Sequence, residues 1–392
     1  MRRLPSGFGV ESRPGRVSFP LPANTGSCAQ TVPIDPLDRA SLAKTPAWRN
    51  VDLKTFRADI IPRDRPAVMR GLVGHWPLVR VGHESPQALL DYIGARDPGV
   101  AQRILVGRPE IKGLYFFRDD LTGLNFEYSS SQLQATLARI LRQANRANAP
   151  GIFMPAAAVE SFPQIGRENT LDILDKPAVA RLWLGNRVTT ATHFDMSDNV
   201  HCVTVGRKRF TFFPPEQLPN LYVGPLDLMW AGLPTSLVKV AAPDLARYPR
   251  FTEAWAAGET ADLEPGDAVF IPNLWWHNVE SLEAVNISVN YWWFDGTRGG
   301  GEPFAAMAHA LLAITPLPES RRELWRRMFE HFVFQTQGDP VPYLPADRRG
   351  ILGPLSPALE DYLRMQLMRS LTKPMPRHLA EQILRLLEQQ KR

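Results

Sequence analysis

The chain has 392 residues, of which 44% are hydrophobic and 22% charged, with 45 Lys and Arg against 40 Asp and Glu. This apolar content, with mixed charges, excludes a disordered protein. No run of about 18 apolar residues occurs, which argues against a membrane-spanning helix and a membrane partner. Two cysteines, Cys28 and Cys202, are too few for a disulfide framework, so we expect a reducing, cytoplasmic compartment.

The excess of positive charge lies at the start of the chain. Residues 1–50 carry seven basic and three acidic side chains, which accounts for +4 of the net charge of +5. A nucleic-acid-binding domain is expected to carry its basic surface on the folded part instead. The composition therefore disfavours a nucleic-acid partner.

The first half of the chain mixes several signals. Residues 1–40 are rich in Pro, Gly and Ser without a sustained period, which predicts a flexible N-terminal arm. Residues 66–72 predict a short buried strand. Ser85 and Pro86 are typical of the cap and first position of a helix, and a helical stripe of apolar residues spans 133–141.

Short strands separated by turns are expected between residues 181 and 295. Gly206 and Arg207 have the length and composition of a hairpin loop between two of these strands. Residues 264–267 form a strong turn signal before another strand. The pattern favours a β-sandwich or barrel. The strand candidates are 189–195, 200–205, 208–213, 268–271 and 287–293.

The pattern turns helical after about residue 302. Apolar stripes at helical spacing cover 304–312, 324–332, 359–367 and 379–387. The apolar faces of these helices must be buried against another surface. That surface is either the β-barrel of the same chain or the helices of a second copy. We therefore expect an N-terminal arm (1–40), a β-rich domain (41–300) and a C-terminal helical region (301–392).

A metal-ligand pattern lies near the end of the first strand candidate. His193 and Asp195 share a strand face because side chains two apart project together; alone, such a pair is usually a surface contact. His277 follows a buried strand 84 residues later, where a lone histidine is usually a satisfied core residue. Together the three residues fit the two-histidine, one-carboxylate triad of non-haem Fe(II) oxygenases.

Lys208 is an independent clue to the ligand. Strand alternation places it on the same face as Phe210 and Phe212, which is the expected interior of a barrel. A buried ammonium is costly without an anion, and no acidic residue neighbours it in sequence. A ligand carboxylate would supply the anion; the alternative is that the amine reaches the rim.

These motifs, in this order, resemble the cupin-like JmjC family, whose hydroxylases include the factor-inhibiting-HIF asparaginyl hydroxylase and the tRNA wybutosine-modifying hydroxylase. The resemblance covers about residues 60 to 295. It rests on Arg65–Val68, His193–Asp195, Asn199, Gly206–Arg209, Phe213–Pro215, Pro265–Asp267, Ile271–Pro272, Trp275–His277 and Ser288–Trp292.

The resemblance implies a mainly β fold, a double-stranded β-helix (cupin or jelly-roll) core with flanking helices. It implies Fe(II) as the cofactor, with 2-oxoglutarate and O2 as co-substrates. His193, Asp195 and His277 would bind the iron. Lys208 and Thr190 would bind the distal carboxylate of 2-oxoglutarate, and Asn199 and Asn290 would line the co-substrate site.

Two positions near the site depart from the pattern or invite a second interpretation. Some relatives place a tyrosine hydroxyl on the co-substrate, but residues 151–154 offer none; Tyr115 is a candidate substitute. His201 is either an alternative ligand or, as relatives favour, a residue that faces the substrate or supports the ligands.

We therefore expect a 2-oxoglutarate-dependent Fe(II) dioxygenase that hydroxylates a protein, a peptide or another sizeable or small-molecule substrate. JmjC-type N-demethylation and tRNA modification are the enzymatic alternatives, because they use the same metal residues. A non-catalytic cupin that binds a ligand is the alternative of another class. Similarity to the asparaginyl hydroxylase implies a homodimer formed through the C-terminal helices.

Overall fold

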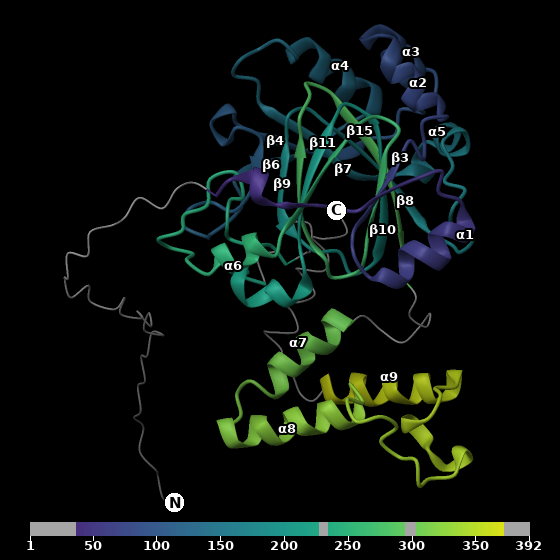
Figure 1. Cartoon of the computed structure of the whole chain (residues 1–392), viewed down its shortest axis with the longest axis vertical. Coiled ribbons are helices and arrows are strands. Elements are labelled where there is room, and N and C mark those ends of the chain that lie inside the picture. The colour runs from purple at the N-terminus through teal and green to yellow at the C-terminus, as the bar shows by residue number, and fades with distance from the viewer. Residues whose placement is uncertain (1–36, 227–233, 295–302, 372–392) are drawn as a thin grey trace, which may run out of the picture. The chain divides into compact units, whose positions relative to one another are not determined.

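The structure is a computed structural model that describes residues 37–226, 234–294 and 303–371 (Figure 1). The chain divides into two compact units, residues 1–294 and 295–392. Residues 1–36 of the expected arm lie outside the described residues. The last residues of the arm, 37–40, are ordered and not flexible as expected. Asp38 caps a 3₁₀ helix at Arg39–Ser41, and its carbonyl accepts a hydrogen bond from the Trp255 indole.

The first unit is built on two sheets. Buried apolar residues from both of them, including Val203, Phe210, Phe212 and Val269, form one cluster, so the sheets face each other as in a jelly roll. The smaller sheet has six strands in the order β1-β12-β11-β14-β9-β5. Its strands are β1 (Ala43–Lys44), β5 (Leu114–Tyr115), β9 (Thr189–His193), β11 (Lys208–Phe213), β12 (Glu259–Leu263) and β14 (Trp276–Ser281).

The larger sheet has nine strands in the order β2-β3-β13-β10-β15-β8-β7-β4-β6. Strands β7, β4 and β6 extend it beyond the core of the jelly roll, and they were not among the strand candidates. The strands are β2 (Ala47–Arg49), β3 (Ala67–Arg70), β4 (Gln102–Gly107), β6 (Phe126–Ser131), β7 (Gly151–Ala158), β8 (Val179–Gly185), β10 (Asp198–Val205), β13 (Ala268–Ile271) and β15 (Asn286–Trp293).

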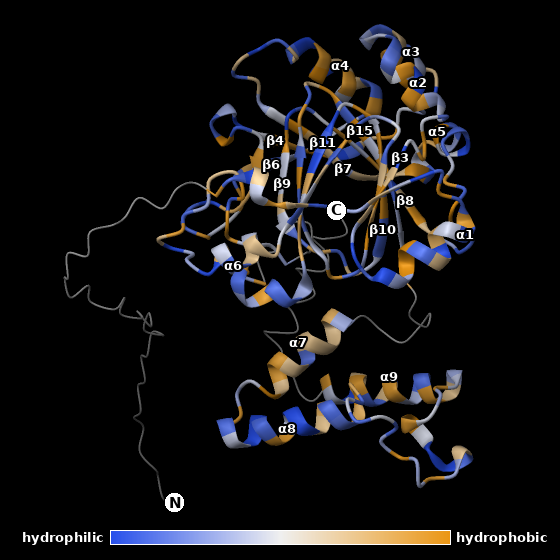
Figure 2. Ribbon diagram, in the orientation of Figure 1, coloured by the Kyte–Doolittle hydropathy of each residue, from blue (hydrophilic) through white to orange (hydrophobic). Residues whose placement is uncertain are grey.

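Helices cover the larger sheet. Buried residues of the helices, such as Leu137 of α4, share a cluster with Leu182 and Leu184 of β8. These helices carry both apolar and polar surface (Figure 2), as helices between core and solvent do. They are α2 (Pro77–Glu84), α3 (Pro86–Gly94), α4 (Leu133–Gln143) and α5 (Pro163–Glu168); α1 (Leu53–Thr55) and α6 (Phe251–Ala256) complete the unit.

Several sequence-based elements are confirmed. The Ser85 hydroxyl accepts a hydrogen bond of 3.1 Å from the Ala88 amide, with Pro86 at the first helical position. The predicted strands 208–213 and 268–271 have the observed bounds. The strand predicted over 189–195 ends earlier, at His193, so Asp195 lies just beyond it.

The predicted hairpin at Gly206 and Arg207 is wrong. Strand β10 pairs with β13 and β15, whereas β11 pairs with β12 and β14. The turn therefore passes the chain from one sheet to the other. Gly206 has φ +74°, and a Cβ there would lie 2.4 Å from the Val285 carbonyl oxygen, so the crossing requires glycine.

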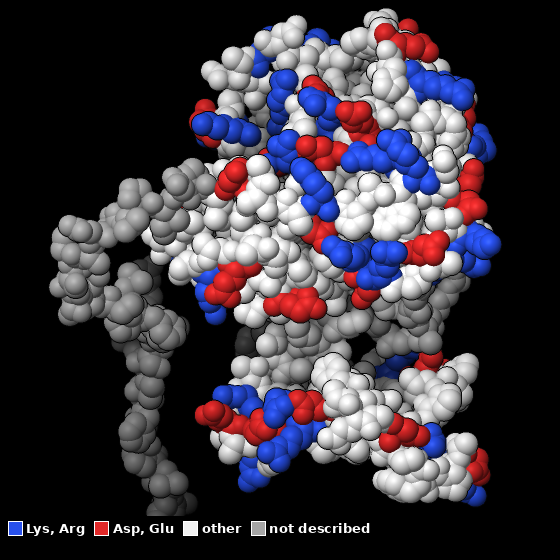
Figure 3. Space-filling model, viewed as in Figure 1, with Lys and Arg blue, Asp and Glu red and all other residues white. Residues whose placement is uncertain are grey.

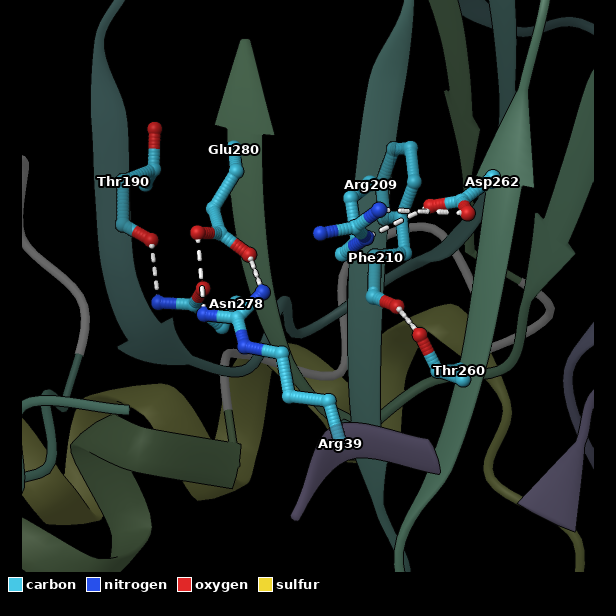
Figure 4. A network of polar contacts seen from close by, with 8 residues as sticks. All are labelled: Arg39, Thr190, Arg209, Phe210, Thr260, Asp262, Asn278 and Glu280. Atoms are coloured by element: carbon cyan, nitrogen blue, oxygen red, sulfur yellow. Dashed lines mark hydrogen bonds and ion pairs between the residues drawn. The ribbon is translucent and has the colours of Figure 1, made fainter. Parts of the chain in front are cut away.

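Polar contacts tie the strands of the smaller sheet together (Figure 4). Arg209 of β11 pairs with Asp262 of β12 directly across the strands, with 2.6 Å between Nε and Oδ1. Glu280 of β14 pairs with Arg39 and so holds the start of the described chain against this sheet. These contacts fix the scaffold from which the site residues project.

The second unit contains α7 (Pro303–Ala313), α8 (Glu319–Phe332) and α9 (Pro357–Leu371), at three of the four predicted stripes. The fourth, 379–387, lies outside the described residues. None of these three helices has a buried residue, and Leu312, Trp325 and Met328 are exposed. Across the described residues, no helix has the length and apolar character needed to cross a membrane.

Candidate metal centre

The structure brings together the three predicted metal ligands. His193, the last residue of β9, pairs directly with His277 of β14, and Asp195 follows two residues later. The imidazole ring centroids are 4.3 Å apart, and His277 Nε2 lies 3.8 Å from Asp195 Oδ2. One ligand atom from each residue lies within 4.8 Å of the other two, and all three residues are buried. The triad thus has the donor atoms and the compactness of a metal site.

Hydrogen bonds set the tautomer of both histidines. The Nδ1 atom of His193 lies 2.8 Å from the Ala191 carbonyl oxygen, and that of His277 lies 2.9 Å from the Trp275 carbonyl oxygen. A carbonyl only accepts, so each Nδ1 carries the proton and each Nε2 keeps its lone pair. Burial, together with the nearby His277, lowers the pKa of His193. The neutral ring is the form that binds a metal.

A chain of hydrogen bonds orients the Asp195 carboxylate. Asp195 Oδ2 accepts from Trp292 Nε1 at 3.0 Å and from Asn199 Nδ2 at 3.1 Å. Asn199 Oδ1 accepts from Asn290 Nδ2 at 3.1 Å, and Asn290 Oδ1 accepts from Trp183 Nε1 at 2.6 Å. The two asparagines predicted for the co-substrate site thus belong to the network that orients the Asp195 carboxylate.

The triad lies in a cavity of about 580 Å³, a size typical of small-molecule sites. The predicted residues Thr190, Asn199, Lys208 and Asn290 all line the same cavity. Strands β9 and β11 flank β14 on either side, so Thr190 and Lys208 project from the two neighbours of the strand that carries His277. The wall further contains Phe153, Trp183, Phe210, Ile271, Val279 and Trp292.

Lys208 is buried with a polar neighbour but no acid. Its Nζ donates to Ser281 Oγ at 3.3 Å, and no carboxylate among the described residues pairs with it. Burial lowers the pKa of this ammonium to about 8. An uncompensated buried cation facing a cavity is the arrangement expected of an anion-binding residue. The alternative that sequence alone left open, in which the amine extends to the rim of the barrel, does not occur, because Lys208 is buried.

His201 lies in the same cavity but outside the triad. Its ring packs edge-on against Phe210 with 5.2 Å between centroids, and its Nε2 has no hydrogen-bond partner among the described residues. Burial lowers the pKa of its imidazole well below the ordinary value. A neutral ring with an open nitrogen can face a ligand, and that role stays a prediction.

Sequence reasoning missed three residues and misplaced one. Trp183 and Trp292 carry the indole donors of the Asp195 network. Trp292 ends the motif Ser288–Trp292 but was given no role, and the physical signal for both was that buried indoles seek an acceptor. Tyr115 does not line the cavity, since its hydroxyl donates to the Leu105 carbonyl at 3.2 Å, so it is not the expected substitute. Among the described residues that line the cavity, the tyrosine is Tyr128 of β6.

Comparison with protein families agrees with this geometry. A family model described as a cupin-like domain matches residues 53–298, which is more than half of the chain. The chain belongs to the cupin-like family. The matched range contains both sheets of the jelly roll from β3 onward and every residue of the candidate metal centre.

Several curated proteins are similar to this cupin-like chain. Human tRNA wybutosine-synthesizing protein 5 is 35% identical over 36% of the chain and 46% of its own length. The Arabidopsis thaliana lysine-specific demethylase JMJ31 is 36% identical over 28% of the chain and 20% of its own length. Human HSPB1-associated protein 1 is 38% identical over 28% of the chain and 22% of its own length. The chain thus spans less than half of each of these relatives.

The donor set of the cupin-like chain fits a ferrous ion. Two imidazole nitrogens and one carboxylate leave further coordination positions open, which is the ligand pattern of non-haem Fe(II) sites. Both histidines have a fixed tautomer and the carboxylate has two hydrogen-bond donors. These supporting contacts are the ones that metal ligands ordinarily have.

Proposed function

We propose that the protein is an Fe(II)- and 2-oxoglutarate-dependent dioxygenase that hydroxylates a protein, a peptide or another sizeable substrate. The observation that carries this proposal is one cavity that contains His193, Asp195, His277 and the unpaired ammonium of Lys208. A metal triad alone also fits a non-catalytic cupin. The added buried cation calls for an anionic ligand beside the metal position.

The charges in the cavity suit a dicarboxylate. A ferrous ion with the Asp195 carboxylate and neutral histidines would carry one net positive charge, and the Lys208 ammonium adds another. The dianion 2-oxoglutarate would neutralise both in a site with little water, where unpaired charges are expensive. Lys208 would bind the distal carboxylate, with Thr190 beside it on the cavity wall.

Each group of this chain would have a defined task. His193, Asp195 and His277 would hold the iron, which supplies with the co-substrate and O2 the oxidising power that no side chain has. Trp292 and Asn199 keep the carboxylate ligand in one orientation. The apolar wall of Phe210, Ile271 and Val279 excludes water from the reacting groups.

N-demethylation is the second candidate, because a relative is named as a lysine-specific demethylase. It would use the same iron and co-substrate residues and would differ only in the carbon attacked. A hydroxylated N-methyl group breaks down to formaldehyde and the amine with one methyl group fewer, whereas a product hydroxylated at another carbon keeps the added oxygen. A tRNA substrate has the same support from the relatives named for wybutosine synthesis.

The experiment that tests the proposal is substrate profiling with a matched inactive variant. Candidate peptides, proteins and tRNA are incubated with the protein, Fe(II), 2-oxoglutarate and O2, and products are measured by mass spectrometry. We expect the mass gain of one oxygen atom with the protein and none with Asp195→Ala. The Asp262→Asn variant, which alters a carboxylate outside the cavity, should match the unmodified protein. If 2-oxoglutarate binds without any turnover, the chain is a binding module instead.

A further inference from the structure

A second cavity of about 580 Å³ lies apart from the metal centre and shares no lining residue with it. Four segments form its wall: the turn after β4 at residues 109–113, the end of α4 with the loop that follows it up to Gly151, the turn between β8 and β9, and Ala284 between β14 and β15. Its polar lining includes Glu110, Lys112, Gln143, Arg146, Asn148 and Arg187. The proposed dioxygenase chemistry uses none of these residues.

The cations of this second cavity lack acidic partners. Lys112, Arg146 and Arg187 are all exposed, and none of them forms a salt bridge with a carboxylate of the described residues. Arg187 donates to the Leu282 carbonyl, at 3.3 Å from Nε. The adjacent Arg207, by contrast, pairs with Glu283. Three cations against the single carboxylate of Glu110 leave the cavity with a positive potential that favours an anion.

The charge imbalance is a property of the sequence as well. No Asp or Glu occurs between Tyr128 and Glu160, a stretch that contains Arg139, Arg142 and Arg146. A basic residue in the last turn of a helix offsets the helix dipole, which accounts for Arg142 of α4. That explanation does not extend to Lys112 or Arg187, which come from other segments. On the face of the 1–294 unit drawn in Figure 3, Lys and Arg side chains are interspersed with Asp and Glu, so the imbalance is a local feature of these segments.

The cavity also contains acceptors for hydroxyl groups. Gln143 Oε1 is buried without a hydrogen-bond partner among the described residues, and Glu110 adds a carboxylate. An unpaired buried acceptor is costly unless a ligand donates to it. No aromatic side chain is among the described residues that line this cavity, so it offers a nucleobase no stacking surface.

The walls are held firmly enough to define a site. A Cβ on Gly113, which has φ +77°, would lie 2.1 Å from the Arg187 carbonyl oxygen, so two of the wall segments touch at the backbone. The Asn186 side chain accepts from the Ile152 amide at 2.9 Å and donates to the Pro150 carbonyl at 2.9 Å. The side chain thus ties the turn between β8 and β9 to the loop after α4.

We propose that this second cavity binds a compact phosphorylated polyol, of the sugar phosphate class. Lys112, Arg146 and Arg187 bind the phosphate group, and Gln143 and Glu110 accept hydrogen bonds from hydroxyl groups. A concave site of this volume suits a small ligand, whereas a nucleic acid needs an extended basic track. The proposal is independent of the proposed dioxygenase function.

Isothermal titration of the full chain with ribose phosphate, free ribose and inorganic phosphate tests this assignment. We expect one ribose phosphate per chain, weaker binding of inorganic phosphate and no measurable binding of ribose. Arg146→Glu, on an exposed loop, should weaken ribose phosphate binding at least about tenfold. Gln143→Leu should weaken ribose phosphate binding several-fold and leave inorganic phosphate unchanged, because inorganic phosphate presents no sugar hydroxyl.

The matched control is Arg49→Glu, which reverses an exposed cation of β2 outside both cavities and should leave binding unchanged. Three results would overturn the proposal: no saturable binding of ribose phosphate, equal losses in Arg146→Glu and Arg49→Glu, or equal binding of ribose phosphate and inorganic phosphate. Tight binding of single-stranded RNA without binding of ribose phosphate would assign the basic residues to a nucleic acid instead.

Discussion

The indole Nε1 of Trp292 donates a hydrogen bond of 3.0 Å to Oδ2 of Asp195, from the opposite sheet of the jelly roll. Asn199 donates to the same oxygen at 3.1 Å. The carboxylate proposed to bind iron is therefore held in place before any metal arrives. Removal of one of these two hydrogen-bond donors should make the Asp195 carboxylate more mobile but leave it in the site.

Trp292→Phe keeps an aromatic ring in the cavity wall but removes this donor. We expect the affinity for Fe(II), or for Mn(II) as a redox-stable probe, to fall about tenfold, the lower end of the losses seen when supporting residues of metal ligands are changed. Calorimetric metal titration measures the effect. Trp325→Phe, on the exposed surface of α8, is the control, and an equal affinity in both variants would refute the positioning role.

Lys208→Met tests the co-substrate site. The side chain is buried beside Ser281 without an acidic partner, so we expect the 2-oxoglutarate requirement to rise steeply while metal affinity stays close to that of the unmodified protein. Methionine is apolar, so thermal stability without ligand should stay equal or increase. An unchanged co-substrate titration would mean that the ammonium does not bind 2-oxoglutarate.

The pKa of Lys208 also predicts a pH dependence. Burial lowers this pKa from 10.5 to about 8, so the ammonium is present below pH 8 and is lost above it. The affinity for 2-oxoglutarate should therefore weaken up to about tenfold per pH unit above pH 8. Conversely, the unfolded chain binds more protons than the folded chain between pH 8 and 10.5, so Lys208 makes ligand-free stability rise across this window. Lys208→Met should abolish both trends, and trends that persist would assign them to another group.

Gly206→Ala tests the crossing between the sheets. The position has φ +74°, and its new Cβ would lie 2.4 Å from the Val285 carbonyl oxygen, so we expect a loss of at least about 2 kcal/mol in the free energy of unfolding. Gly71→Ala is the matched control, because Gly71 has φ +69° with no atom within 4 Å of the added Cβ. It should lose about 1 kcal/mol from backbone strain alone. If chemical denaturation gives both variants the same loss in the free energy of unfolding, the contact between the new Cβ and the Val285 carbonyl is relieved without cost.

The exposed apolar residues of α7 and α8 predict self-association. Leu312, Trp325 and Met328 are 69%, 46% and 47% exposed, which is unusual for isolated helices in water. We expect light scattering to give twice the mass of one chain, and Leu312→Glu combined with Met328→Glu to give a monomer. If the unmodified chain is a monomer, the alternative is favoured, in which the apolar faces of the helices pack on the barrel of the same chain.

The metal triad could be predicted because Asp195 follows His193 by two residues and a buried strand precedes His277, although β9 ends at His193 and Asp195 lies just beyond it. The identity of the cross-strand partners could not, because the pairing register across β8, β10 and β15 brings Trp183, Asn290, Asn199 and Trp292 together. The hairpin error at Gly206 has the same origin. A two-residue turn indicates that the chain reverses, but not which sheet receives the next strand.

The extension of the larger sheet by β7, β4 and β6 was likewise outside the reach of local patterns. Strand β6 (FEYSSS) is largely exposed, so it lacks the apolar alternation by which a strand is recognised. For that reason Tyr128 was missed as a cavity residue, whereas Tyr115, a candidate for the co-substrate site, lies outside the cavity lining. Both errors concern residues whose position depends on distant segments.

The central claim is that His193, Asp195 and His277 hold one ferrous ion beside the ammonium of Lys208, ready for a dicarboxylate. Anaerobic addition of Fe(II) and then 2-oxoglutarate, followed by visible absorption, tests it most directly. We predict a weak charge-transfer band for the unmodified protein, no band for His193→Ala, and a band that needs far more 2-oxoglutarate for Lys208→Met. No band in the unmodified protein, or an undiminished band in His193→Ala, would contradict the assignment of the iron site.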